Sequence, residues 1–169
     1  SDLCASGGYY IAAAADSIYA NRASLVGSIG ARMGSFGFSD TMQMLGVERR
    51  VVASTDRKTF MDPFSPENPD DVKHASELVG EVHQQFIDAV KLGRGNRLVG
   101  QEKDLFSGLL WTGTKSLELG LIDGLADARR VAEEIIEQPE MVNYTRQGSV
   151  VDQLLGRLGI SLGYQSPLF

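Results

Sequence analysis

The chain opens on a pattern that few folds accommodate, because a short apolar run, a serine, two adjacent glycines and an alanine-rich segment follow one another directly. Residues 2–5 are typical of the end of a buried strand, which Ser6, Gly7 and Gly8 interrupt. Residues 9–17 are then expected to form a buried helix. A strand, a glycine turn and a helix in this order predict a layered α/β fold. Because no turn or cap precedes the first strand, we expect the sequence to be the C-terminal part of a longer protein.

Hydrophobic periodicity and glycine and proline punctuation predict the remaining elements. The long helix is indicated by apolar residues that recur at steps of three and four, and Thr112 and Thr114 are candidate caps for the helix that follows them. Short strands are expected at residues 17–19, 24–26, 48–53 and 121–123. Helices are expected at residues 41–45, 71–91, 115–119 and 125–137.

The chain is long enough for one domain with its own core, since 43% of its 169 residues are hydrophobic. We expect residues 1–147 to form this domain and residues 148–169 to form a helical tail. Val151, Leu154, Leu155 and Leu158 stand at helical spacing in the tail. The tail has almost no lysine, which favours docking on a neighbouring subunit or domain over binding to a membrane.

Composition excludes several classes of function. The formal net charge is −6 without a basic cluster, which argues against binding nucleic acid. The longest apolar run, residues 9–15, is far shorter than the roughly 18 residues of a membrane span. The single cysteine, Cys4, excludes an internal disulfide and a cysteine-based metal site. His74 and His83 fall on opposite faces of one predicted helix, so they cannot share a metal ion.

Ser6 is the most distinctive candidate for chemistry. A serine between a strand and a helix presents its hydroxyl beside free backbone N–H groups, and the N–H of Gly7 could stabilise an oxyanion there. The sequence lacks the G-x-S-x-G elbow of α/β-hydrolases, because Cys4 stands two positions before the serine. Two alternatives remain open: Ser6 could simply cap a buried helix, or Ser1 could be an N-terminal nucleophile. Cys4 is expected to be a packing residue.

A serine nucleophile requires a base, and neither histidine is well placed to serve. A lysine kept neutral by burial is the usual substitute. Of the five lysines, only Lys58 follows a predicted strand and precedes an apolar stretch, Thr59-Phe60-Met61. Neighbouring aromatic and methionine side chains would disfavour its charged form. A solvated loop lysine is the alternative interpretation.

Four blocks of sequence resemble the signal peptide peptidase A family of bacterial Ser-Lys serine proteases. The run from Ala5 to Ala12, ASGGYYIA, is similar to its nucleophile motif, and Val26-Gly27-Ser28-Ile29-Gly30 is similar to its second motif. The segment around Arg57-Lys58 resembles the one that carries the general base. Trp111-Thr112-Gly113 together with Leu119-Gly120-Leu121-Ile122-Asp123 matches its C-terminal signature. The blocks occur in the expected order over residues 1 to about 130.

The resemblance implies a ClpP/crotonase-like fold and hydrolysis of peptides, including cleaved signal peptides, in or near the membrane. It implies Ser6 as nucleophile, Lys58 as general base, Ser28 as the residue that holds the lysine, and Gly7 as an oxyanion donor. No metal or cofactor is expected. It also implies a homo-oligomer, a membrane tether in an N-terminal segment outside this sequence, and a protease domain on the extracytoplasmic side of the bacterial cell membrane.

The sequence departs from the family in two ways: Cys4 replaces a small residue, and an N-terminal half that carries a second oxyanion donor lies outside it. Losing one such donor costs roughly 10²–10³ in turnover, so this chain alone could be inactive. Three other functions remain open. A Ser-His-Asp protease would need a histidine that residues 7–73 lack. The others are a catalytically silent scaffold for membrane-associated partners and a crotonase-type acyl-CoA enzyme.

Overall fold

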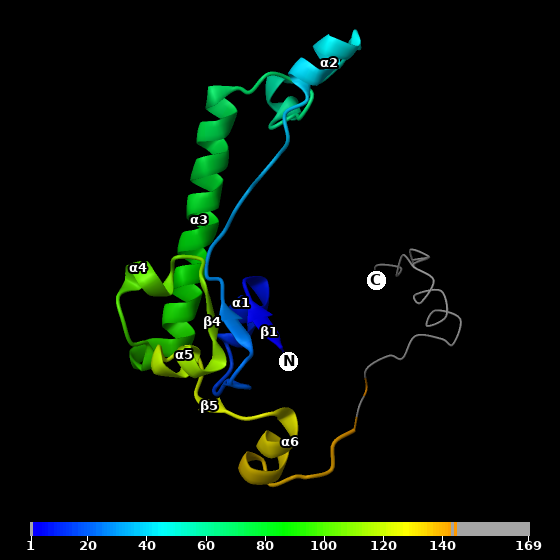
Figure 1. Ribbon diagram of the computed structural model, residues 1–169. Coiled ribbons are helices and arrows are strands. Elements are labelled where there is room, and N and C mark those ends of the chain that lie inside the picture. Colours follow the sequence, from blue (N-terminus) through cyan, green and yellow to red (C-terminus); the bar gives the residue numbers. More distant parts are fainter. Residues whose placement is uncertain (1, 143, 145–169) are drawn as a thin grey trace, which may run out of the picture.

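The computed structural model describes residues 2–142 and 144, and the predicted tail at residues 148–169 lies outside them. Figure 1 shows a body, built from both ends of the described chain, and an arm that projects from it. The arm consists of residues 31–68 and the N-terminal half of the long helix α3 (Pro69–Arg94). The described residues mix helices and short strands, as an α/β protein does.

A three-stranded sheet lies at the centre of the body. Strand β1 (Leu3–Ala5) runs parallel to β3 (Leu25–Gly27), and β3 pairs antiparallel with β4 (Leu110–Thr112). Helix α1 (Gly7–Ala12) lies between β1 and β3 in sequence, so these elements form a β–α–β unit. The predicted strand, turn and helix are confirmed. The helix is shorter than residues 9–17, because the chain passes into turns after Ala12.

A two-stranded parallel sheet pairs β2 (Tyr19–Ala20) with β5 (Gly124–Leu125). The strand predicted at residues 121–123 and the helix predicted to begin at residue 125 are therefore wrong in position. The N–H of Asp123 donates to the carbonyl of Ile18, which places the next two residues beside β2. Helix α6 (Ala128–Arg130) begins only after Asp127, whose carboxylate accepts from the N–H of Arg130. A wider turn, η3 (Val131–Ile135), follows it.

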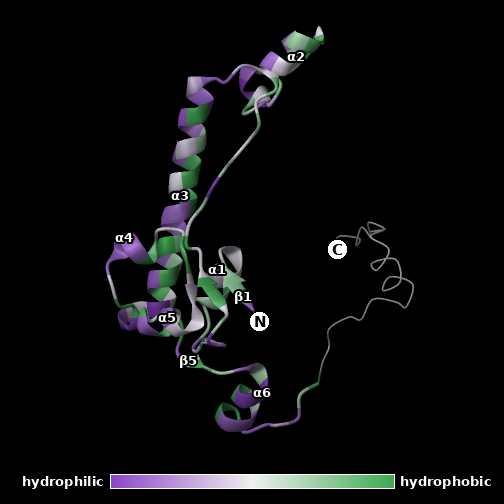
Figure 2. Ribbon diagram, in the orientation of Figure 1, coloured by the Kyte–Doolittle hydropathy of each residue, from purple (hydrophilic) through white to green (hydrophobic). Residues whose placement is uncertain are grey.

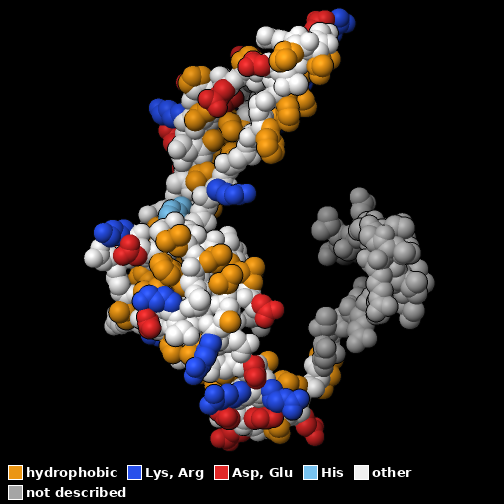
Figure 3. Space-filling view, in the orientation of Figure 1, with side chains coloured by type: hydrophobic (Ala, Val, Ile, Leu, Met, Phe, Trp, Pro, Cys, Tyr) orange, Lys and Arg blue, Asp and Glu red, His pale blue; other side chains and the backbone are white. Residues whose placement is uncertain are grey.

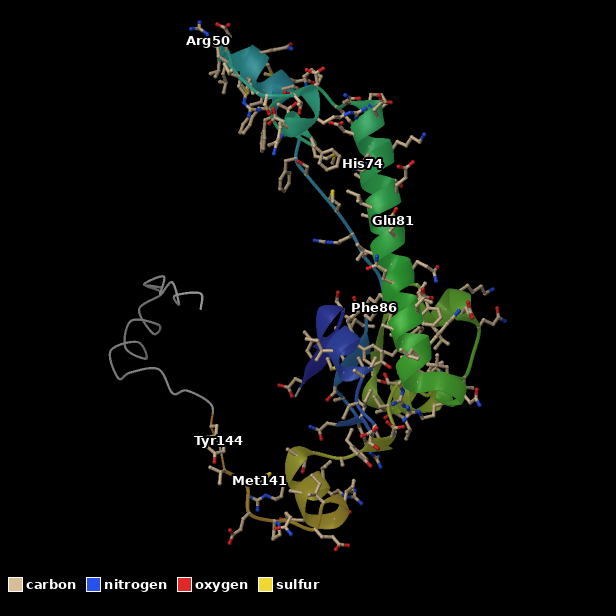
Figure 4. The ribbon with its side chains drawn as sticks, turned by 180° about the vertical axis from the view of Figure 1, so that it is seen from behind. Arg50, His74, Glu81, Phe86, Met141 and Tyr144 are labelled. Atoms are coloured by element: carbon tan, nitrogen blue, oxygen red, sulfur yellow. The ribbon has the colours of Figure 1, made fainter. Side chains whose placement is uncertain are left out.

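Helix α3 confirms the predicted long helix and extends it at both ends. It begins after Asn68, whose side chain accepts a hydrogen bond of 2.9 Å from the N–H of Asp70. Hydrophobic and hydrophilic residues alternate along it (Figure 2). Phe86 lies at the level of α1, whereas His74 and Glu81 lie in the half that stands away from the body (Figure 4). In that half, Val72 of the expected apolar face is exposed.

The arm contains α2 (Ser39–Leu45), confirmed at its predicted place and ended by Gly46 in a left-handed conformation. It also contains η1 (Asp56–Thr59), a turn of 3-10 helix. The strand predicted at residues 48–53 is wrong, because no neighbouring strand pairs with this segment among the described residues. The Val52 side chain is fully exposed there.

Contacts across the arm tie its loop segments together. The N–H of Phe38 donates to the carbonyl of Pro63 at 2.6 Å, and the Phe38 and Phe64 rings stack at 5.6 Å. Arg57 pairs with Asp71 of α3 at 3.2 Å. The remaining short helices belong to the body: η2 (Gly95–Arg97), α4 (Glu102–Leu105) and α5 (Gly113–Glu118).

Candidate active site

Ser6 occupies the turn between β1 and α1, in a backbone conformation that non-glycine residues rarely adopt. Its φ is 51° and its ψ is −122°. This conformation lies outside the small left-handed region open to L-residues and costs roughly 1–3 kcal/mol. A sharp strand-to-helix turn of this kind pushes the serine side chain out of the sheet. The structure thus supplies an elbow that the sequence, lacking G-x-S-x-G, did not predict.

The Ser6 side chain is exposed and makes no capping hydrogen bond to α1. Its hydroxyl therefore does not cap α1, which excludes the alternative that Ser6 serves only as a helix cap. Gly7 and Gly8 are also exposed, and a Cβ added to either would meet no atom within 4 Å. The backbone beside Ser6 is therefore exposed with open space around both glycines, which lets a substrate carbonyl approach an oxyanion donor at Gly7.

Ser28 lies beside Ser6, because Ala5 pairs with Gly27 where β1 and β3 run parallel. The N–H of Ser6 donates to the carbonyl of Gly27 at 2.8 Å. Ser28 has the same positive φ of 51°, and its own N–H donates to the carbonyl of Leu109 at 2.8 Å. Two serines in unusual backbone conformations thus meet at one end of the sheet.

Trp111, which the sequence placed in a motif but not in a strand, lies on β4 opposite Val26. Its ring covers Gly27, where an added Cβ would lie 3.2 Å from the ring and 3.1 Å from the carbonyl oxygen of Leu109. The indole N–H is buried and has no acceptor within the described part of the chain. Trp111 itself is half-buried, and the run Leu110-Trp111-Thr112, rich in residues that favour strands, was the sequence signal that could have identified β4.

Lys58 is held far from Ser6 in this chain. It belongs to η1, which lies beside α2 at the outer end of the arm, whereas β1 and α1 lie in the body (Figure 1). Its side chain is exposed and lines a shallow cavity of about 500 Å³ whose walls all come from residues 49–63. The structure brings together Ser6, Gly7 and Ser28, but it does not bring Lys58 to them.

The other groups with possible reactivity are one cysteine and two histidines, and His83 has a buried Nε2 with no hydrogen-bond partner among the described residues. Cys4 is half-buried, and burial raises the pKa of its thiol, which disfavours the nucleophilic thiolate. His74 packs edge-on against Phe60 in the arm at 5.6 Å, and His83 lies on the same helix nine residues later. Within the described residues no cluster of three histidine, cysteine or acidic side chains is arranged to hold a metal ion.

Comparison with known proteins places these residues in a family. Residues 1–141 match the model of peptidase family S49. The matched region includes β1, the turn at Ser6, the arm and the C-terminal motif around Trp111. A protein of Enterococcus faecium named as signal peptide peptidase SppA is 28% identical over 144 residues, 85% of this chain and 42% of its own length. A protease of Synechocystis is 32% identical over 134 residues, 78% of this chain and 48% of its own length.

A protein of Brucella abortus named as the Na⁺/H⁺ antiporter NhaA is also similar, with 51% identity over 128 residues. The match covers 76% of this chain but only 17% of that protein. The chain thus spans less than half the length of each of these three relatives. The match over residues 1–141 nevertheless covers most of the sequence. The chain therefore belongs to peptidase family S49.

Proposed function

We propose that the chain is the nucleophile-bearing part of a serine endopeptidase that uses Ser6 and Lys58 as a catalytic dyad. The observation that carries this proposal is the backbone of Ser6, which is held at φ 51° and ψ −122° with its hydroxyl exposed and uncapped. Strained conformations cluster at functional sites, where the surrounding structure maintains them. Membership of peptidase family S49 supports the same chemistry.

In the proposed reaction Lys58 accepts the proton of the Ser6 hydroxyl as its Oγ attacks a peptide carbonyl carbon. The N–H of Gly7 stabilises the negative charge that develops on the carbonyl oxygen. The intermediate collapses, the C–N bond breaks, and the departing amine takes the proton from the lysine. A water molecule, deprotonated by the same lysine, then hydrolyses the acyl-enzyme. Ser28, beside Ser6, holds the lysine amine through a hydrogen bond.

The separation of Ser6 and Lys58 bears on how the dyad is assembled. A lysine acts as a base in its neutral form, which burial favours, yet Lys58 is exposed in a single chain. We propose a homo-oligomer in which the arm of one copy brings Lys58 to Ser6 of the next. Apolar side chains gathered along the arm support such a contact (Figure 3). The arm side chains with the largest exposed fractions are those of Phe36, Met44, Leu45 and Val52.

The substrates that we propose are peptides, including cleaved signal peptides, as the name of the Enterococcus faecium relative suggests. The corresponding setting is the bacterial cell membrane, with the protease domain on its extracytoplasmic side and a tether in a segment outside this sequence. Among the described residues no helix has the length and hydropathy needed to cross a membrane. We also propose a ClpP/crotonase-like fold, which the β–α–β unit at Ser6 supports.

The test is covalent labelling of the full-length protein by a fluorophosphonate probe between pH 6 and 10, with the modified residue located by mass spectrometry. Ser6→Ala and Lys58→Ala are measured alongside, after circular dichroism has shown that they fold. Labelling at Ser6 that rises with pH and disappears in Lys58→Ala supports the dyad. Full labelling of Lys58→Ala removes the lysine from the mechanism, and labelling of Ser6→Ala at another residue removes the serine.

One observation favours a second candidate, a catalytically silent scaffold for membrane-associated partners. The Brucella abortus relative is 51% identical yet is named as an antiporter. A non-catalytic role predicts that neither the chain nor the full-length protein is labelled at Ser6. Labelling at Ser6 in the full-length protein excludes this second function as the sole one.

A further inference from the structure

The first and last family motifs are joined by one buried hydrogen bond. The hydroxyl of Tyr9, three residues after Ser6, donates to the carbonyl oxygen of Leu121 at 2.7 Å. Both residues are fully buried. Burial also raises the pKa of Tyr9 far above its ordinary value, so the phenol remains a donor under all working conditions. The bond connects two segments that lie 112 residues apart in the chain.

Helix α1 depends on such an anchor because it cannot hold its own position. It contains six residues, and its N-cap side chain makes no hydrogen bond to it. Helices this short are not stable without tertiary contacts. The strained Ser6 lies directly before it, fixed on one side by the hydrogen bond from its N–H to Gly27. On the other side, Tyr9 is the first buried side chain of the helix.

The carbonyl that Tyr9 binds is itself held in place. Arg94 of α3, with 1% of its surface exposed, donates through Nε to the carbonyl of Gly120 at 2.9 Å. Its two terminal nitrogens donate to the carboxylate of Asp123 at 2.7 and 2.9 Å. The same carboxylate accepts from the N–H of Ile18 at 2.7 Å. Leu121 thus lies between two residues that are fixed by one buried arginine.

We propose that Tyr9 is a positioning residue for Ser6, and that the Arg94–Asp123 pair maintains the carbonyl to which Tyr9 is anchored. This role rests on the proposed function, since it concerns the geometry of the nucleophile. The hydrogen bond fixes the first turn of α1 and therefore the directions of the Ser6 hydroxyl and the Gly7 N–H. Displacing reacting groups by about 1 Å can cost up to about a hundredfold in rate.

The test compares Tyr9→Phe with Tyr10→Phe in the full-length protein. The first variant removes only the buried hydroxyl and keeps the ring, and the second removes the hydroxyl of the adjacent, exposed tyrosine. Four quantities are measured well below the unfolding temperature: the rate of fluorophosphonate labelling at Ser6, kcat and KM for a peptide substrate, and the amide hydrogen exchange rate of residues 4–10.

We expect Tyr9→Phe to lower the labelling rate and kcat about tenfold, with KM within about twofold of wild type. Exchange of residues 4–10 should be faster in Tyr9→Phe and unchanged in Tyr10→Phe. A folded Tyr9→Phe that is labelled at the wild-type rate, even with a lower unfolding temperature, overturns the positioning role alone. A wild-type protein that is not labelled at Ser6 overturns the proposed function, and this role with it.

Discussion

Gly93 of α3 lies directly against the backbone of Ala13, at the point where α1 ends. A Cβ at position 93 would overlap the carbonyl group of Ala13, so the two segments approach as closely as they do only because residue 93 is a glycine. This approach places Phe86 and Val90 of α3 in the same core as Tyr9. The packing of α3 on α1 is therefore part of what holds the helix that follows Ser6.

Replacing Gly93 by alanine should destabilise the protein by about 3 kcal/mol, because the overlap with Ala13 forces the two helices apart. The matched control is Gly80→Ala on the same helix, where an added Cβ meets nothing within 4 Å. That change should stabilise the protein by about 0.5–1 kcal/mol through helix propensity. Urea denaturation measures both. Equal effects of the two substitutions would contradict the close contact.

A second prediction concerns Gly27, which precedes Ser28 and accepts a hydrogen bond from the N–H of Ser6. Its φ is 107°, and an added Cβ would press on Trp111 and on the carbonyl of Leu109. Gly27→Ala should therefore cost about 2 kcal/mol and slow fluorophosphonate labelling of the folded protein. Gly34→Ala, where there is open space, should change neither. Labelling of Gly27→Ala at the wild-type rate would show that the backbone conformation at Gly27 does not affect the reactivity of Ser6.

The pH dependence of stability should report the Arg94–Asp123 pair. Partial burial alone would raise the pKa of Asp123, but hydrogen bonds from Arg94 and the Ile18 N–H, with the charges of Arg94 and Arg97, lower it below its ordinary value. The folded-state pKa is thus below the unfolded value of about 3.9. The ionised carboxylate therefore contributes fully above that value, and its contribution is lost as the pH falls through the folded-state pKa.

Asp123→Asn should lower the free energy of unfolding by about 3 kcal/mol at pH 7, because it leaves a fully buried arginine without its counter-ion. The difference in free energy of unfolding between Asp123→Asn and wild type should become smaller as the pH falls below about 4, because Asp123 becomes progressively protonated in the wild type. Glu118→Gln, which removes an exposed pair with Lys115, should cost less than about 1 kcal/mol. A difference for Asp123→Asn that stays constant down to pH 2.5 would contradict the assignment.

The arm should be buried between copies if the homo-oligomer forms as proposed. Met44 of α2 has 87% of its surface exposed, so Met44→Glu should shift the full-length protein toward smaller species in sedimentation velocity. Gln43→Glu adds the same charge to the neighbouring, exposed position and should leave the distribution unchanged. If both variants sediment as wild type does, the surface of α2 around Met44 is not an interface between copies.

The elements that local sequence determines were predicted well. The stripe of apolar residues gave α3, and Gly46 marks the end of α2, because both signals act within a few residues. Residues 48–53 were predicted wrongly for the opposite reason. Their valines favour a strand, but a strand also needs a partner, and sequence periodicity carries no information about where that partner lies.

The candidate site divides along the same line. The strand, serine and glycines predicted an exposed hydroxyl beside the Gly7 N–H, and the register of β1 and β3 places Ser28 next to it. The positive φ of Ser6 could not be read from the residues, since the contacts on either side of it, from its N–H to Gly27 and from Tyr9 to Leu121, join segments that are far apart in the sequence. The placement of Lys58 on an arm could not be predicted from the sequence either, because it depends on the path that residues 31–68 take through space.

Mixing two inactive variants tests most directly whether Ser6 and Lys58 act together although one chain holds them apart. Ser6→Ala and Lys58→Ala of the full-length protein are combined, dissociated and allowed to reassemble, and peptide hydrolysis is then measured. A dyad formed between copies predicts recovery of up to about a quarter of wild-type activity, from sites that receive an intact serine and an intact lysine. A mixture that stays as inactive as its components, after native mass spectrometry has shown mixed oligomers, would contradict a dyad formed between copies.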